Sequence, residues 1–114
     1  MMYVVACLVI RLTITTMSEA ASKQKTSKQL ERHMKGVSNH HRIDILRLIA
    51  KRERMSLDGI TRSLNGNVKT VAEHTRRLAH AGLIEKRYKG RSVIHTLSPY
   101  GKIVHKFLTT FSHS

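Results

Sequence analysis

The segment that decides the fold is NVKTVAEHTRRLAHAGLI, residues 67–84. It has the pattern of one short helix, because Asn67 can cap its start and Gly82 can adopt the left-handed conformation that ends a helix. Its apolar side is thin and consists of Val68, Val71, Ala72 and Leu78. Its opposite side carries Lys69, Glu73, Arg76, Arg77 and His80. This polar side must contact either solvent or a charged partner.

The residues before this segment predict a second, shorter helix. Three leucine or isoleucine residues recur at helical spacing within residues 57–64, directly after a possible cap, Ser56. Asn65-Gly66 then indicates a tight turn. A short helix, a tight turn and a helix with a polar outer side form the helix-turn-helix arrangement.

The residues after the segment predict a β-hairpin and a last helix. Two β-prone runs, residues 83–88 and 92–97, flank the basic tip Lys89-Gly90-Arg91. Ser98-Pro99 is a typical helix start. The last helix has one apolar stripe, formed by Ile103, Val104, Phe107, Leu108 and Phe111.

Two more helices are predicted before the helix-turn-helix. Residues 30–37 have apolar residues at helical spacing, with Gly36 as the expected end. Ser38 or Asn39 can cap the next helix, whose wide apolar stripe predicts that it is the most buried. The predicted fold is therefore mainly α with a small β-hairpin: a winged helix-turn-helix. In this fold, helix 67–81 would read the DNA major groove, and the wing, residues 83–97, would contact the backbone or minor groove.

The charge of the chain favours a nucleic-acid partner. Its 114 residues include 21 Lys and Arg against 7 Asp and Glu, a formal net charge of +14. The basic residues are spread through the patterned segments, as expected for a nucleic-acid binder. An inert basic surface and a tail that binds anionic membranes are the alternatives.

The N-terminal residues do not fit the pattern of the rest. An apolar run of seven residues, 4–10, is too short to span a membrane and lacks the preceding basic residues of a signal peptide. We therefore expect residues 1–26 to be an extension that is disordered or, for residues 1–16, a translation-start artefact, and residues 27–111 to be the winged helix-turn-helix DNA-binding domain. An extra β-strand or a short anchor are the alternatives for residues 1–16. The single cysteine, Cys7, excludes a disulfide within the chain and fits a reducing cytoplasm.

Four blocks of the sequence resemble successive blocks of ArsR-type winged helix-turn-helix regulators. They are VSNHHRIDILRLI, MSLDGITRSL, NVKTVAEHTRRLAHAGLI and KGRSVIHTLSPYG, and the resemblance covers residues 30–111. It differs at three places: Asn39-His40 replaces a usual Asp-Pro, Gly66 an apolar turn residue, and His95 a frequent tyrosine. The resemblance implies a dimeric transcriptional repressor in which the first and last helices pair two chains.

The candidate DNA-binding residues come from three segments. Arg77 can pair with guanine and Glu73 can accept a hydrogen bond from cytosine N4. The full predicted set is Lys69, Thr70, Glu73, His74, Arg76 and Arg77 on the helix, Arg87, Lys89 and Arg91 on the wing, and His41 and Arg42 at the start of the second helix. The alternatives are a solvated helix face, a hairpin tip charged only because it is exposed, and an internal salt bridge for Arg42.

The candidate dimer interface is apolar. It comprises Leu30, Met34, Ile103, Val104, Phe107, Leu108 and Phe111. The alternative is that the last helix folds back on its own core and the protein is a monomer.

No metal site or enzyme is predicted. None of the eight histidines has another four residues away, and His40 and His41 would point apart in a helix. A site formed by His105 and His113 across a dimer is conceivable, but surface histidines are the expectation, with no cofactor. The sequence has no glycine-rich phosphate loop and no paired acidic motif, so catalysis is not expected.

Together these features predict a sequence-specific, double-stranded DNA-binding transcriptional regulator. It is expected to be a cytoplasmic homodimer that represses, without a membrane partner and with no effector identified. A winged-helix adaptor for RNA or protein, and a nonspecific architectural DNA-binding protein, are the alternatives. The varied chemistry of the outer face at residues 69–77 favours sequence reading.

Overall fold

The computed structural model of the protein describes residues 24–114. The chain divides into two units, residues 1–30 and residues 31–114, and the second contains the whole predicted helix-turn-helix. The expectations for the extension fall largely on residues 1–23, which lie outside the described residues. Within the described part of the chain, no helix combines the length and apolarity needed to cross a membrane.

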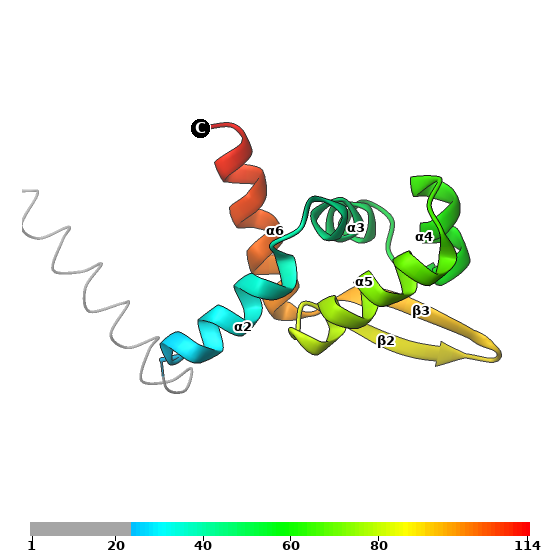
Figure 1. Cartoon of the computed structure of the whole chain (residues 1–114), viewed down its shortest axis with the longest axis horizontal. Helices are drawn as coiled ribbons and strands as arrows, with labels where there is room; N and C mark the ends of the chain where they lie inside the picture. Colours follow the sequence, from blue (N-terminus) through cyan, green and yellow to red (C-terminus); the bar gives the residue numbers. More distant parts are fainter. Residues whose placement is uncertain (1–23) are drawn as a thin grey trace, which may run out of the picture. The chain divides into compact units, whose positions relative to one another are not determined.

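The order of elements confirms the predicted fold (Figure 1). The described elements are α2 (Ser27–Val37), α3 (His40–Lys51), β1 (Met55–Ser56), α4 (Leu57–Leu64), α5 (Val68–His80), β2 (Ile84–Lys89), β3 (Ser92–Leu97) and α6 (Pro99–Ser112).

The helix starts lie where their capping side chains predict. Asn39 accepts hydrogen bonds from the first turn of α3, Asn67 from that of α5, and Ser98 from that of α6. In the turn between α4 and α5, Asn65 has a φ of 52°, the left-handed conformation that Asn tolerates best after Gly. These local signals determine where α4 ends and where α5 begins.

One helix end differs from the prediction. Gly36 does not end α2, which continues to Val37. A Cβ atom at Gly36 would overlap the Cβ of Ala81. The glycine is therefore needed for close packing of α2 on the end of α5, and not as a helix stop.

The sheet contains a strand that the sequence did not predict. The order is β1-β3-β2, all antiparallel, with Met55 opposite His95 and Ile84 opposite Leu97. His95 is only 2% exposed, and its Nδ1 lies 3.0 Å from the carbonyl oxygen of Met55, which accepts the hydrogen bond. The expectation that the histidines lie at the surface is thus wrong for His95. It is also wrong for His33, which is 6% exposed.

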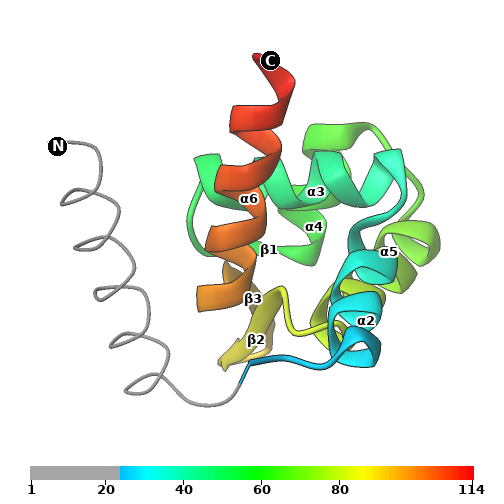
Figure 2. The same cartoon turned by 90° about the vertical axis from the view of Figure 1, so that its left-hand side faces the viewer.

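The core lies where α3, α4, α5 and the start of β2 meet. Leu46, Ile60, Leu78 and Leu83 are fully buried. Helix α3 is central: it contacts α4, α5 and α6, and α6 crosses it in the view of Figure 2. This position of α3 leaves the outer side of α5 uncovered.

Candidate nucleic-acid interface

Helix α5 has one buried face and one exposed face. Val71, Thr75 and Leu78 are buried, whereas Lys69, Thr70, Arg76 and Arg77 are exposed. Val68, which the sequence pattern placed on the apolar side, is 47% exposed. The buried face holds α5 on the core, so the exposed face is presented to a partner without any change in the fold.

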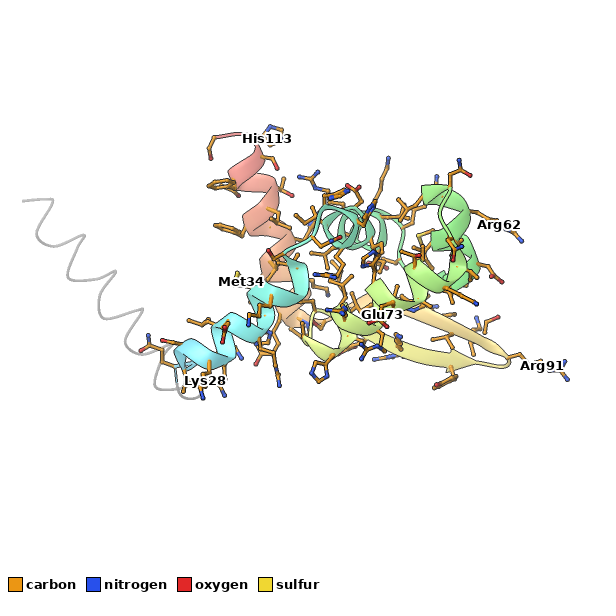
Figure 3. The ribbon with its side chains drawn as sticks, viewed as in Figure 1. Lys28, Met34, Arg62, Glu73, Arg91 and His113 are labelled. Atoms are coloured by element: carbon orange, nitrogen blue, oxygen red, sulfur yellow. The ribbon has the colours of Figure 1, made fainter. Side chains whose placement is uncertain are left out.

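The wing carries its predicted cations at the surface. Arg87, Lys89 and Arg91 are all exposed, and Arg87 is only loosely paired, with 3.9 Å between its Nη2 and Glu85 Oε2. Figure 3 places Arg91 at the tip of the hairpin, which extends away from α6. The tip turns at Gly90, whose φ is 64°.

Two exposed side chains near this surface were absent from the predicted site. Tyr88 is 83% exposed on β2, one residue before Lys89. Arg62 is exposed on the outer side of α4, as Figure 3 shows. An apolar or aromatic residue inside a basic hairpin is the sequence signal that could have identified Tyr88.

The start of α3 lies against the side of α5. Arg42 Nη1 is 3.5 Å from His74 Nδ1, and the rings of His41 and His74 stack with centroids 5.6 Å apart. His40 and His41 do not point apart, since their ring centroids are 3.9 Å apart. The structure therefore joins two predicted segments, residues 41–42 and residue 74, that are distant in sequence.

Arg42 has no carboxylate partner among residues 24–114. Its Nη2 donates a hydrogen bond to the carbonyl oxygen of Lys35 at 3.4 Å, and its buried Nε has no hydrogen-bond partner. The alternative of an internal salt bridge for Arg42 is therefore not observed. Its guanidinium keeps donor capacity for an anion, because arginine offers five N–H donors.

The surroundings of His74 favour its neutral form. Burial lowers the pKa of His74, and the charges of Arg42, His41 and Arg77 lower that pKa further, against a smaller opposite effect of Glu73. An additional negative charge nearby would favour the protonated form of His74. A DNA phosphate would supply one.

The only carboxylate of α5 is fully engaged within the helix. Glu73 Oε2 accepts from Arg76 Nε at 2.9 Å, and Glu73 Oε1 accepts from Arg76 Nη2 at 2.7 Å and from Arg77 Nε at 3.1 Å. The hydrogen bonds from Arg76, and then those from Arg77, lower the pKa of Glu73 to about 2. Glu73 is thus a carboxylate at any pH at which the protein is expected to function.

The predicted dimer residues divide into two sets. Ile103, Phe107 and Phe111 are 66%, 58% and 68% exposed. Val104, by contrast, is 8% exposed and belongs to the core of its own chain, and Leu108 packs against that core. Val104 is therefore not available to a partner. Leu30 and Met34 of α2 are 48% and 45% exposed.

A metal site is not formed by the described residues. Residues 24–114 contain no group of three or more His, Cys, Asp or Glu side chains that could hold a metal ion.

The model of a protein family described as HVO_A0114 matches residues 39–105. No curated protein matches the chain. Among solved structures, HlyU from Vibrio cholerae is 22% identical with a TM-score of 0.71, and the match covers 80% of this chain and 99% of that one.

A second solved structure is similar to the same extent. It is the homodimeric winged helix-turn-helix DNA-binding domain of Mb0332 from Mycobacterium bovis, described as a possible ArsR-family transcriptional regulator. It is 20% identical with a TM-score of 0.69, and the match covers 81% of this chain and 90% of that one. These similarities confirm the winged helix-turn-helix fold predicted from the sequence.

Proposed function

We propose that this chain, which belongs to the HVO_A0114 family, is a sequence-specific, double-stranded DNA-binding transcriptional regulator and acts as a repressor in the cytoplasm. The observation that carries the proposal is the exposed polar face of α5, which stands beside a basic wing in a protein of net charge +14. The buried opposite side of α5 fixes this polar face at the surface, where a partner can reach it.

The geometry supports one way of docking. The 13 residues of α5 span about 20 Å, a length that fits the DNA major groove. Arg77 and Glu73 would then face base edges, while Arg76 lies nearer the rim and suits a phosphate. Arg42 and His41 would contact the phosphates next to α5, and the wing cations would contact the backbone or the minor groove.

We further propose that the protein binds DNA as a homodimer. The exposed row Ile103, Phe107 and Phe111 on α6 is the kind of apolar surface that marks an interface, with Met34 and Leu30 of α2 as the other contributors. The similar Mb0332 domain is described as homodimeric. Two-fold symmetry would place the two α5 helices in successive major grooves, about 10 base pairs apart.

The chemistry of α5 favours this function over the alternatives. A nonspecific architectural protein needs only Lys and Arg on its DNA-facing surface, whereas α5 presents threonine, glutamate and arginine together. The same variety favours a DNA reader over an adaptor that uses its charge alone.

The test is selection of duplexes from a random-sequence library, followed by binding measurements at several salt concentrations. We expect a two-fold symmetric site and an affinity that falls with salt, with a log–log slope of about −0.9 per neutralised phosphate. Arg77→Ala should reduce the free energy of binding to the selected site by about 1–3 kcal/mol and relax the base preference. Lys89→Ala should weaken binding to all sequences to a similar degree. Lys51→Ala, at an exposed position on the end of α3, is the control and should change neither the affinity nor the base preference. If no duplex is enriched, or if binding does not respond to salt, the proposal is wrong.

A further inference from the structure

Glu73 stands in the middle of the face that would enter the groove. It is the only acidic residue of α5, and Figure 3 places it on this helix. At 3.6 residues per turn it lies on the opposite side of α5 from the buried Val71, Thr75 and Leu78. An acidic side chain at this position opposes the charge that attracts DNA, so its presence needs an explanation.

The hydrogen bonds of Glu73 restrain both arginines that follow it. Arg76 binds the carboxylate with two donors, and Arg77 binds it with a third, at distances between 2.7 and 3.1 Å. All three side chains remain about half exposed, at 45% for Glu73, 61% for Arg76 and 57% for Arg77. Such exposed ion pairs contribute little to stability, so they can exchange for other partners when DNA approaches.

The groove determines whether that exchange is favourable. A carboxylate only accepts hydrogen bonds. Phosphates and the O6 and N7 atoms of guanine also only accept, so a Glu73 pressed against them would be desolvated beside like charge and without a donor. The amino groups of cytosine N4 and adenine N6 do donate and would replace the arginines as partners of Glu73.

We infer that Glu73 is a specificity-determining residue: it holds Arg76 and Arg77 in ion pairs on the free protein and releases them to DNA only where a cytosine or adenine amino group occupies its carboxylate. At other sequences the carboxylate keeps the arginines and opposes the phosphates. This inference rests on the proposed DNA binding and adds that α5 discriminates by penalising wrong sequences as well as by favouring the right one.

The experiment compares Glu73→Gln with the full chain. The amide keeps the shape of the side chain but loses the charge and the bidentate acceptor. We expect affinity for random-sequence duplex to rise about tenfold, and the ratio of selected-site to random-site affinity to fall by at least about tenfold, as expected when one base-reading contact is lost. Selection with the variant should also lose a cytosine or adenine preference at one position of each half-site.

Glu31→Gln is the matched control. Glu31 also forms an i,i+4 ion pair, with Lys35 at 3.0 Å, but it lies on α2 and outside the proposed groove-facing surface. The Glu31→Gln substitution changes the net charge of the protein by the same amount as Glu73→Gln does. If the position of the carboxylate matters and not the net charge, the affinity of the Glu31→Gln variant for random-sequence duplex should change by less than about twofold. Thermal unfolding of both variants checks that each is folded, since both substitutions are at exposed positions.

Three outcomes contradict the inference. If Glu73→Gln keeps the selected sequence and the affinity ratio of the parent, Glu73 is only a helix-surface residue, while DNA binding itself stands. If Glu31→Gln raises random-duplex affinity as much as Glu73→Gln does, the effect is net charge alone. If the parent enriches no duplex, the proposed function and this inference both fail.

Discussion

Helices α3 and α6 have similar sequence patterns but different surroundings. Both carry five apolar residues at helical spacing, yet on α3 the three residues Ile45, Leu46 and Ile49 are at most 1% exposed. On α6 the apolar residues that were predicted to form a single stripe divide into a buried set and an exposed set. Val104 and Leu108 pack inward, and Arg47 of α3 donates a hydrogen bond to Ser112 at 2.8 Å on the same side. The other face, Ile103, Phe107 and Phe111, is exposed.

The difference shows that periodicity predicts an amphipathic helix but not what covers it. The buried side of α3 is covered by α4, α5 and α6 together, whereas α6, among the described elements, packs mainly on α3 and β3. An apolar face that stays exposed on a small domain either binds a partner or lowers the solubility of the protein.

The largest effect is expected from Leu46→Ala. Leu46 is fully buried, so its loss removes transfer free energy and leaves a cavity, and the free energy of unfolding should fall by about 2–5 kcal/mol. Ile103→Ala on the exposed face of α6 is the matched change and should cost less than about 1 kcal/mol in the protomer. Urea denaturation at low protein concentration measures both. Equal losses would mean that the two helices are buried to the same degree in solution.

A smaller effect is expected from Gly101→Ala at the buried start of α6. The new Cβ would overlap the carbonyl oxygen of Leu83 and would lie 2.9 Å from the carbonyl carbon of the same residue. Helix α6 must therefore shift. We expect a loss of about 1–3 kcal/mol, as for other overpacked positions. Gly59→Ala in α4 is the comparison: the nearest atom to the new Cβ is Ser56 Oγ at 3.3 Å, and this tight contact offsets the gain in helix propensity of up to about 1 kcal/mol, so the net change should be smaller than for Gly101→Ala. A neutral Gly101→Ala would show that α6 is not fixed on Leu83.

Acidification should weaken the side of α3 that packs on α5 and β3. Burial lowers the pKa of both His74 and His95 in the folded protein; the hydrogen bond to Met55 only partly offsets this for His95. The unfolded chain therefore binds protons that the folded protein resists, so stability is highest above an unperturbed histidine pKa of about 6.5 and falls as the pH drops below it.

The measurement is the urea midpoint between neutral and mildly acidic pH. His74→Asn should reduce the pH dependence, whereas His80→Asn, at an exposed position of the same helix, should not. DNA should have the opposite effect on His74, since a phosphate favours its charged form, and binding should take up a proton. Stability that rises on acidification would contradict the buried, neutral state of these histidines.

The smallest effect on the fold is expected from Phe107→Asp combined with Phe111→Asp. Both positions are exposed, so the free energy of unfolding of the protomer should change by less than about 1 kcal/mol. Sedimentation equilibrium should nevertheless change from about twice the chain mass of 13.0 kDa to about once. Lys102→Asp with Thr109→Asp, on the opposite side of α6, should leave association intact. A parent that is monomeric at tens of micromolar would remove the proposed dimer.

The sequence by itself determined the parts that depend on local interactions. Caps such as Asn67 and Ser98 act within one helical turn, and the periods of the apolar residues set which side of α5 faces inward. The element order and the exposed face of the candidate site followed from these signals. The pairing of Glu73 with Arg76 and Arg77 is also local, because residues three and four apart are neighbours on a helix surface.

Only the tertiary structure decided which distant residues meet. The two-residue strand β1 exists because Met55 pairs with His95, forty residues away, and it is too short to show a period of its own. The contact of Arg42 with His74 depends on how α3 crosses α5. The two faces of α6 arise in the same way, since burial is fixed by the space that the rest of the chain leaves and not by the helix that fills it.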